Sequence, residues 1–368
     1  MIFVCGLPAR YQGAMRTVVL SILALGARLA FGDVDPALVK KAQEAAVIIR
    51  TPLGGGSGAL VNLDGATYIV TNQHVLEGSP AADVHIKFPD GSPAYPAAAE
   101  ISADDADVLR LKIASSRTAL RCNDADPVLG SEVVAIGNSL DAGVVTINPG
   151  HILGVGPSEL EVDCEFVPGN SGGPLIDKTG QIIGLPAYLR LVDGVAGTEG
   201  TRYSKPRRFC VRVHDGMKWI PIANWPQYAS IGKSIASAES VYYEVAAVAK
   251  AIATNENVST LNPRQPLVSE AIRNYQQLCA RVNKMSGQYV TSNQLNQNNN
   301  TLGSVYCVTF QKLRDACASS IKDLNFRPIP KEWAWLEKQR KEVLAALEEM
   351  AKAADAESRN RPQFLNFY

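Results

Sequence analysis

The segment Gly169-Asn170-Ser171-Gly172-Gly173-Pro174-Leu175 contains the residues best suited to chemistry. A serine hydroxyl becomes a nucleophile when a base removes its proton and nearby donors hold the oxyanion. Glycines beside the serine let the backbone turn tightly and direct N–H groups into one small space. The pattern predicts a nucleophilic serine, and the alternative is a plain glycine-rich loop.

The segment Thr71-Asn72-Gln73-His74-Val75 supplies a candidate base. It follows the apolar run Tyr68-Ile69-Val70, where a strand is expected to lead into a loop. A lone histidine there is more often structural. The remaining histidines (His85, His151 and His214) lack a comparable setting. We therefore select His74 as the candidate general base.

Together these segments resemble the chymotrypsin-like serine proteases, especially the HtrA/Deg branch without a PDZ domain. Three further segments match the branch in chain order: Gly56–Val61 with its strand entry, Val133–Asn138 with the strand before its specificity loops, and Ile182–Leu185 with the strand after its nucleophile loop. The resemblance covers about residues 46–213. The joint order of the segments is much more specific than any single motif.

The resemblance implies a chymotrypsin-like double six-stranded β-barrel with the active site between the barrels. Ser171 would be the nucleophile, His74 the general base and then the general acid, and the N–H groups of Gly169 and Ser171 the oxyanion hole. The implied function is a serine endopeptidase that hydrolyses protein substrates through an acyl-enzyme. The alternative, from another class, is a catalytically silent protease-like module for binding or scaffolding.

The third member of the triad is a choice between two aspartates. The family has an aspartate just before an apolar strand, and here Asp104-Asp105-Ala106-Asp107 precedes Val108–Ile113. Strand alternation places Asp107 on the same face as Leu109 and Leu111, so its side chain points inward. Asp105 has the same parity and fits the family spacing nearly as well. We prefer Asp107 and keep Asp105 as the alternative.

The resemblance also implies a substrate-binding wall. Ala187 and Tyr188, on the strand after Gly184, would line the primary specificity pocket. Glu165, six residues before Ser171, falls near the position of the pocket floor. A carboxylate there would favour Lys or Arg substrates. The alternative is that Glu165 faces solvent.

The elements around these residues divide the chain in two. Apolar runs at roughly 8–12-residue spacing, each ended by a turn residue, predict an all-β barrel or sandwich. The runs are Ala46–Arg50, Gly58–Val61, Tyr68–Thr71, Val84–Phe88, Val108–Ile113, Val133–Ile136, Val144–Ile147, Leu160–Val162, Gln181–Leu185 and Phe209–Val213. Asp35-Pro36 predicts the start of a short helix that reaches about Ala46. We expect a protease domain over residues 33–228.

Residues 229–368 are predicted to be helical and to have no recognisable role. Apolar positions repeat at helical spacing in four segments, the last of which opens at Pro330. Ser292–Asn300, rich in Asn and Gln, is expected to be a mobile loop between the second and third helices. Cys279 and Cys317 fall on inward stripes, so a disulfide between them is one hypothesis and two free thiols the other. The region is a candidate surface for a protein partner or for self-association.

The N-terminal segment predicts export. Met15-Arg16-Thr17 precedes the apolar run Val18–Leu25, and Ala30-Phe31-Gly32 offers the small residues of a cleavage site. We expect a signal segment over residues 1–32 and a periplasmic or secreted protein; the alternative is a buried N-terminal helix. Removal of this segment would also remove Cys5.

The composition and the residue spacings exclude several classes of protein and of binding site. The 368 residues include 36 Lys+Arg and 36 Asp+Glu, so the net charge gives no footprint for nucleic acid. No apolar run reaches the roughly 20 residues of a membrane-spanning helix. The histidines and cysteines lack zinc-ligand spacings, and Gly54–Gly58 leads into a strand and not into a helix, which argues against a phosphate loop. We therefore expect no metal, no cofactor, no nucleic acid and no stable membrane span, with protein or peptide substrates as partners.

Overall fold

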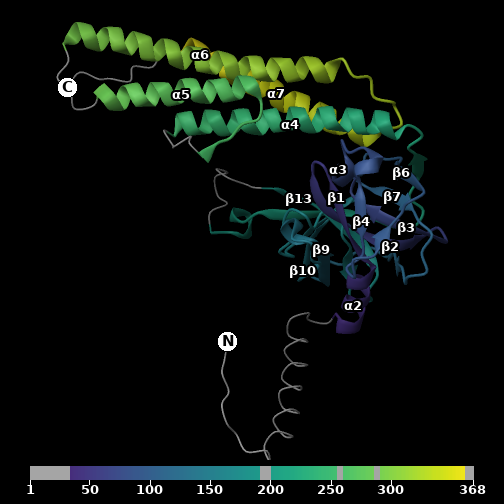
Figure 1. The fold of residues 1–368 in the computed structure, drawn as a ribbon. Helices are drawn as coiled ribbons and strands as arrows, with labels where there is room; N and C mark the ends of the chain where they lie inside the picture. Colours follow the sequence, from purple (N-terminus) through teal and green to yellow (C-terminus); the bar gives the residue numbers. More distant parts are fainter. Residues whose placement is uncertain (1–33, 191–199, 255–259, 286–290, 361–368) are drawn as a thin grey trace, which may run out of the picture. The chain divides into compact units, whose positions relative to one another are not determined.

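The computed structural model describes residues 34–190, 200–254, 260–285 and 291–360, which form two compact units (Figure 1). One unit ends at Pro226 and the other begins at Gln227. The expected signal segment, residues 1–32, lies outside the described residues.

Helix α2 (Pro36–Ala45) opens the first unit as its sequence predicts. The Asp35 side chain caps the helix by accepting a hydrogen bond from the Ala37 N–H at 2.8 Å. Pro36 occupies the first helical position, where its missing N–H has no intrahelical partner to lose. Val39 and Ala42 are buried on the inner face.

Nine strands form the first sheet. Their spatial order is β15-β6-β7-β3-β2-β1-β4-β5, and β8 pairs with β2. The strands are β1 (Ala46–Thr51), β2 (Gly54–Leu63), β3 (Ala66–Thr71), β4 (His85–Lys87), β5 (Pro93–Ala94), β6 (Ala98–Ser102), β7 (Leu109–Lys112), β8 (Leu120–Arg121) and β15 (Trp219–Pro221). The inward residues of the longer strands, such as Ile49, Leu60 and Ile69, are fully buried and form its core.

Six further strands close into a barrel in the order β10-β11-β14-β13-β12-β9. They are β9 (Glu132–Gly137), β10 (Thr146–Val155), β11 (Glu159–Val162), β12 (Leu175–Asp177), β13 (Ile182–Arg190) and β14 (Arg207–Arg212). The barrel interior is filled by apolar side chains such as Val133, Leu160 and Leu175. The predicted fold class is confirmed: a six-stranded barrel and a further sheet precede a helical region.

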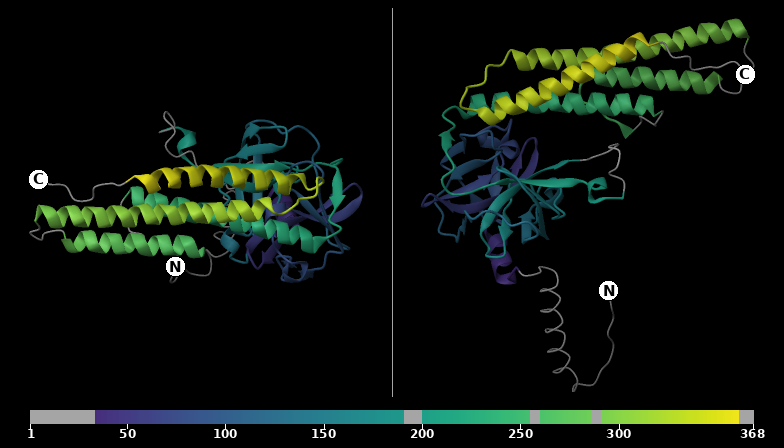
Figure 2. Two further views of the ribbon diagram at one scale, coloured as in Figure 1. Left: turned by 90° about the horizontal axis from the view of Figure 1, so that it is seen from above. Right: turned by 180° about the vertical axis from the view of Figure 1, so that it is seen from behind.

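The described residues of the second unit include four long helices, which are drawn from two sides in Figure 2. They are α4 (Trp225–Ala253), α5 (Pro266–Met285), α6 (Ser292–Asn325) and α7 (Ala334–Arg359). Both views of Figure 2 place α5 and α7 alongside α6. Buried residues such as Val245, Tyr275 and Leu313 repeat at helical spacing and face the interior. Helix α7 begins at Ala334, so the predicted start at Pro330 was four residues too early.

The expected loop at Ser292–Asn300 is wrong, because these residues form the first turns of α6. Thr291 and Gln294 make a capping box, in which each side chain bonds the other residue's backbone N–H. Leu295 and Leu302, seven residues apart, are buried on one face. These contacts outweigh the low helix propensity of asparagine, which costs only about 0.7 kcal/mol per residue at most.

The hypothesis of a Cys279–Cys317 disulfide is also wrong, since the six cysteines from Cys122 onward are all free thiols. Burial raises the pKa of Cys317 to about 11. Residues on inward stripes of two helices can be buried together without their sulfur atoms meeting, because a disulfide also requires specific Cα separation and Cβ direction.

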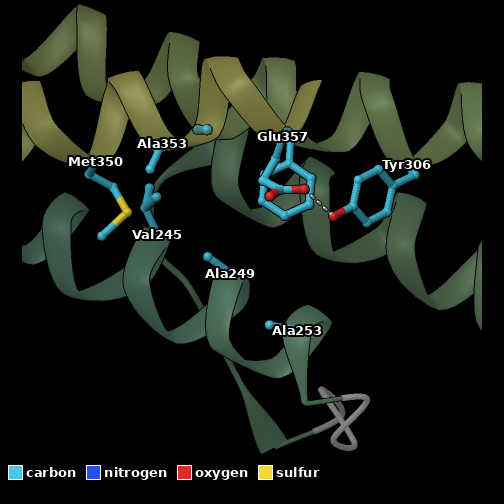
Figure 3. A pocket seen from close by; sticks show the side chains of 9 residues that line it. Val245, Ala249, Ala253, Tyr306, Met350, Ala353 and Glu357 are labelled. Atoms are coloured by element: carbon cyan, nitrogen blue, oxygen red, sulfur yellow. Dashed lines mark hydrogen bonds between the residues drawn. The ribbon is translucent and has the colours of Figure 1, made fainter. Parts of the chain in front are cut away.

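A cavity of about 240 Å³ lies among α4, α6 and α7 of the helical unit (Figure 3). Among its nine lining residues, only Tyr306 and Glu357 have polar side chains. The Tyr306 hydroxyl donates to Glu357 Oε2 at 2.7 Å, as the dashed line in Figure 3 marks. Burial, aided by this hydrogen bond, raises the pKa of the Tyr306 phenol. The cavity is therefore apolar with a single paired polar group.

Candidate active site

The pairing of β3 with β7 brings the segments of His74 and Asp107 together. Thr71, the last residue of β3, lies opposite Leu109, the first residue of β7, in an antiparallel register. His74 follows β3 in the short helix α3 (Gln73–Leu76), and Asp107 precedes β7. The two side chains therefore approach each other at the end of the sheet where β3 finishes and β7 begins.

Both carboxylate oxygens of Asp107 accept hydrogen bonds from His74. The ring Nδ1–H donates to Oδ2 at 2.6 Å, and the backbone N–H donates to Oδ1 at 3.1 Å. A carboxylate at Nδ1 fixes the imidazole tautomer and leaves Nε2 able to accept a proton. The alternative residue, Asp105, is exposed. The structure thus brings the Asp107 carboxylate to the imidazole ring of His74.

Two buried amide side chains hold the Asp107 segment in place. Asn72 Nδ2 donates to the carbonyl of Asp107 at 2.8 Å, and Gln73 Nε2 donates to the carbonyl of Ala106 at 2.8 Å. Both amides come from fully buried residues. Nothing local in the sequence predicts this function, although the two amides directly precede His74, because their acceptors lie about 35 residues away along the chain.

Ser171 lies in the loop that leads into β12, against strand β13. Its hydroxyl donates to the carbonyl of Ala187 at 3.2 Å. A register shift between Pro186 and Tyr188 leaves Ala187 without a partner on β14. A shift of this kind bends the strand and frees a carbonyl group. The structure therefore places Ala187 beside Ser171.

Gly172 lets the serine loop pack directly on the backbone that leads to His74. A Cβ atom at this position would lie 2.2 Å from Thr71 Oγ1 and 2.9 Å from the Asn72 nitrogen. Its φ of +83° also belongs to the left-handed region that favours glycine. No larger residue fits without displacing backbone. Ser171 and His74 are thus carried by segments in direct contact.

The backbone N–H groups of Gly169 and Ser171 are available to bind an anion. Gly169 has a φ of +95°, and a Cβ there would lie 2.2 Å from the Asn138 carbonyl oxygen. Within the part of the chain that the structure describes, neither N–H donates a hydrogen bond. Two unpaired donors on one loop beside a serine can stabilise the negative charge of a tetrahedral intermediate.

Tyr188, which was expected to line the specificity pocket together with Ala187, has a side chain held by two contacts. The Tyr188 hydroxyl donates to Glu159 Oε2 at 2.9 Å, and its ring stacks on Phe209 with centroids 5.1 Å apart. These contacts fix Tyr188 next to Ala187. Glu165 is exposed, which favours the alternative that its carboxylate faces solvent.

The cysteines of the barrel do not compete with Ser171 as nucleophiles. Burial raises the pKa of Cys164 to about 12 and that of Cys210 well above its usual value. A thiol reacts as its thiolate, so a buried thiol with a high pKa is inert near neutral pH.

Within the described residues there is no indication of a metal site or of a membrane-spanning helix. There, no group of three or more His, Cys, Asp and Glu side chains could hold a metal ion. No helix in the described ranges is both long and apolar enough to cross a bilayer.

Part of the chain is similar to known peptidases. Residues 56–185 match the trypsin-like peptidase domain family. The chain is 32% identical over 170 residues to a probable periplasmic serine endoprotease, DegP-like, of Chlamydia pneumoniae, with 44% of this chain and 33% of that protein covered. It is 30% identical over 168 residues to the chloroplastic protease Do-like 1 of Arabidopsis thaliana, with 42% of this chain and 37% of that protein covered.

The chain spans about a third of the length of these curated relatives. Among solved structures, a serine endoprotease from Yersinia pestis aligns with a TM-score of 0.38 and 24% identity, covering 48% of this chain and 61% of that one.

Proposed function

Because the chain carries a trypsin-like peptidase domain similar to that of the DegP-like serine endoproteases, we propose that it is a serine endopeptidase. Its catalytic residues are Ser171, His74 and Asp107, and its oxyanion hole consists of the N–H groups of Gly169 and Ser171. The observation that carries the proposal is the 2.6 Å hydrogen bond between His74 Nδ1 and Asp107 Oδ2, on a segment in contact with the serine loop.

The proposed mechanism has two halves. His74 Nε2 takes the proton of Ser171 as Oγ attacks the substrate carbonyl, and the two N–H groups bind the resulting oxyanion. His74 then gives the proton to the leaving amine, which departs and leaves an acyl-enzyme. A water molecule, deprotonated by His74, attacks the ester; His74 then returns this proton to Ser171 Oγ as the ester bond breaks and the acid leaves. Asp107 stays ionised and stabilises the imidazolium.

The substrate class in this proposal is protein or peptide. Ala187 and Tyr188 line the wall of the specificity pocket. Glu165 is left out of the pocket because it is exposed. The N-terminal segment 1–32 and the periplasmic relatives support export of the chain to the periplasm or the exterior.

In the proposed domain organisation, the protease domain covers residues 33–228 and the helical domain covers residues 229–368. The compact units, divided after Pro226, support this organisation. The helical domain is proposed to bind a protein partner or a second copy of the chain.

An acyl-enzyme predicts a burst when the protein hydrolyses a p-nitrophenyl ester. Stopped-flow absorbance should show a rapid release of about one nitrophenol per chain, followed by a slower steady rate set by deacylation. Ser171→Ala should abolish the burst. A steady rate that begins without a burst, and an acyl adduct that cannot be trapped by acid quench and mass spectrometry, would contradict the acyl-enzyme. Ester hydrolysis no faster than in buffer alone would favour a catalytically silent module.

A further inference from the structure

Ser57, in β2, contacts the serine loop through its buried hydroxyl. The residue is fully buried. Its Oγ–H donates to the carbonyl of Gly169 at 2.7 Å, and the same Oγ accepts a hydrogen bond from the Asn138 N–H at 2.8 Å. A side chain of the first sheet thus bridges the serine loop and the turn that follows β9.

The backbone of Ser57 makes two more such contacts. Its N–H donates to the carbonyl of Ser171 at 2.8 Å. Its own carbonyl accepts a hydrogen bond from Thr71 Oγ1 at 2.7 Å, three residues before His74. One residue is therefore bonded to the carbonyls of both residues whose N–H groups form the candidate oxyanion hole.

These bonds matter because the orientation of a peptide plane decides where its N–H points. The Gly169 N–H belongs to the plane whose carbonyl, on Pro168, accepts from the Leu140 N–H at 2.7 Å. The Ser171 N–H belongs to the plane whose carbonyl, on Asn170, accepts from the Gly173 N–H at 3.0 Å. The plane between them carries the Gly169 carbonyl that Ser57 holds.

Apart from Ser57, the hydrogen bond that holds this middle plane among the described residues lies within the loop: the Asn170 N–H donates to the Val167 carbonyl at 3.1 Å. Gly169 has no side chain to restrict its rotation and already has a φ of +95°. A rotation there would change the angle between the two donor N–H groups. An external donor from a rigid strand prevents that rotation.

We propose that Ser57 is a positioning residue that orients the oxyanion hole through the Gly169 carbonyl. The inference rests on the proposed peptidase function. Ser57 touches no reacting atom. Its substitution is therefore expected to raise the free energy of the transition state, where the oxyanion forms, and to leave substrate binding unchanged. Loss of one oxyanion donor lowers kcat about 10²–10³-fold. Loss of the group that orients a donor should lower kcat less, by about 10–10²-fold.

The test compares Ser57→Ala with Ser79→Ala. Ser79 is also fully buried in the first unit, but its hydroxyl has no hydrogen-bond partner among the described residues. Both variants therefore remove one buried hydroxyl oxygen, but only the Ser57 hydroxyl contacts the serine loop. We expect Ser57→Ala to lower kcat and kcat/KM equally, with KM within about twofold of wild type. Ser79→Ala should retain wild-type kcat.

The rate of reaction with a fluorophosphonate should fall with kcat, because the phosphonylation of the serine oxygen, which displaces fluoride, also needs the oxyanion hole. Near-UV circular dichroism establishes that each variant is folded. If Ser57→Ala does not fold, Ser57→Cys decides the question, since its thiol keeps a side chain in place but is a weak donor. An unchanged kcat in the folded variant would overturn the role of Ser57.

The outcomes separate this inference from the proposed function. A wild-type protein that reacts with the fluorophosphonate, together with a Ser57→Ala variant that reacts at the same rate, refutes the inference alone. A folded wild-type protein that does not react refutes the peptidase proposal, and the inference with it. A loss that appears as a raised KM with unchanged kcat would assign Ser57 to substrate binding and also refute the inference.

Discussion

Ser171→Ala is expected to lower kcat/KM for peptide hydrolysis by about 10⁶-fold, the scale seen when a triad serine is removed. The variant lacks the oxygen that forms the acyl-enzyme, while the backbone donors and the substrate wall remain. Residual hydrolysis would come from the oxyanion hole and binding alone. The measurement is the rate of cleavage of an unfolded protein, followed by mass spectrometry of the new termini.

The stability of Ser171→Ala should match that of the wild type, since within the described residues the Ser171 hydroxyl makes one hydrogen bond, to the Ala187 carbonyl, and such a bond contributes only about 0.5–1.5 kcal/mol. Thermal unfolding is the control. Cleavage by Ser171→Ala at more than about a hundredth of the wild-type rate would show that another residue performs the chemistry.

Asp107→Asn is expected to lower kcat by about 10⁴-fold. The amide has nearly the shape of the carboxylate and can still accept the His74 N–H bond, but it provides no negative charge to stabilise the imidazolium. It also permits the wrong imidazole tautomer, in which Nε2 carries the proton and cannot accept that of Ser171. The measurement is kcat as a function of pH.

Asp105→Asn is the matched control, because it makes the same chemical change two residues away on an exposed side chain. We expect its kcat to lie within a fewfold of the wild type. The reverse result, a large loss in Asp105→Asn and none in Asp107→Asn, would reassign the triad aspartate.

The sequence predicted the candidate site best where the indicative residues are close together in the chain. Asp107 precedes β7 by two residues, so strand alternation alone predicted its inward direction. The glycines around Ser171 indicated a tight turn. The structure adds why Gly172 is needed, since a Cβ atom there would collide with Thr71.

The roles of Ser57, Asn72 and Gln73 could not be predicted in the same way. Each is a buried polar residue whose partner lies 33 to 112 residues away, and no periodicity in the sequence records such a pair. Short strands were missed for a related reason. Strands β5 and β8 have two residues each, too few to show alternation, and form only because longer neighbours offer backbone partners.

At the N-terminus of α6 the prediction of a loop was wrong because the composition of the segment was given more weight than the spacing of its apolar residues. Asparagine and glutamine in Ser292–Asn300 suggested a loop, but Leu295 and Leu302 and the capping residue Thr291 were already present in the sequence. Two apolar residues seven positions apart lie on one face of a helix. They were sufficient to stabilise this helix because α5 and α7 pack against α6.

The most direct test of the peptidase proposal is to react the purified protein with a fluorophosphonate and to locate the adduct by peptide mass spectrometry. Such a reagent modifies a serine that is activated by a base and faces an oxyanion hole. We expect one adduct per chain, on Ser171, and none in Ser171→Ala or after denaturation. A folded wild-type protein that remains unmodified, or an adduct on a different serine, would contradict the assignment of Ser171, His74 and Asp107 as a catalytic triad.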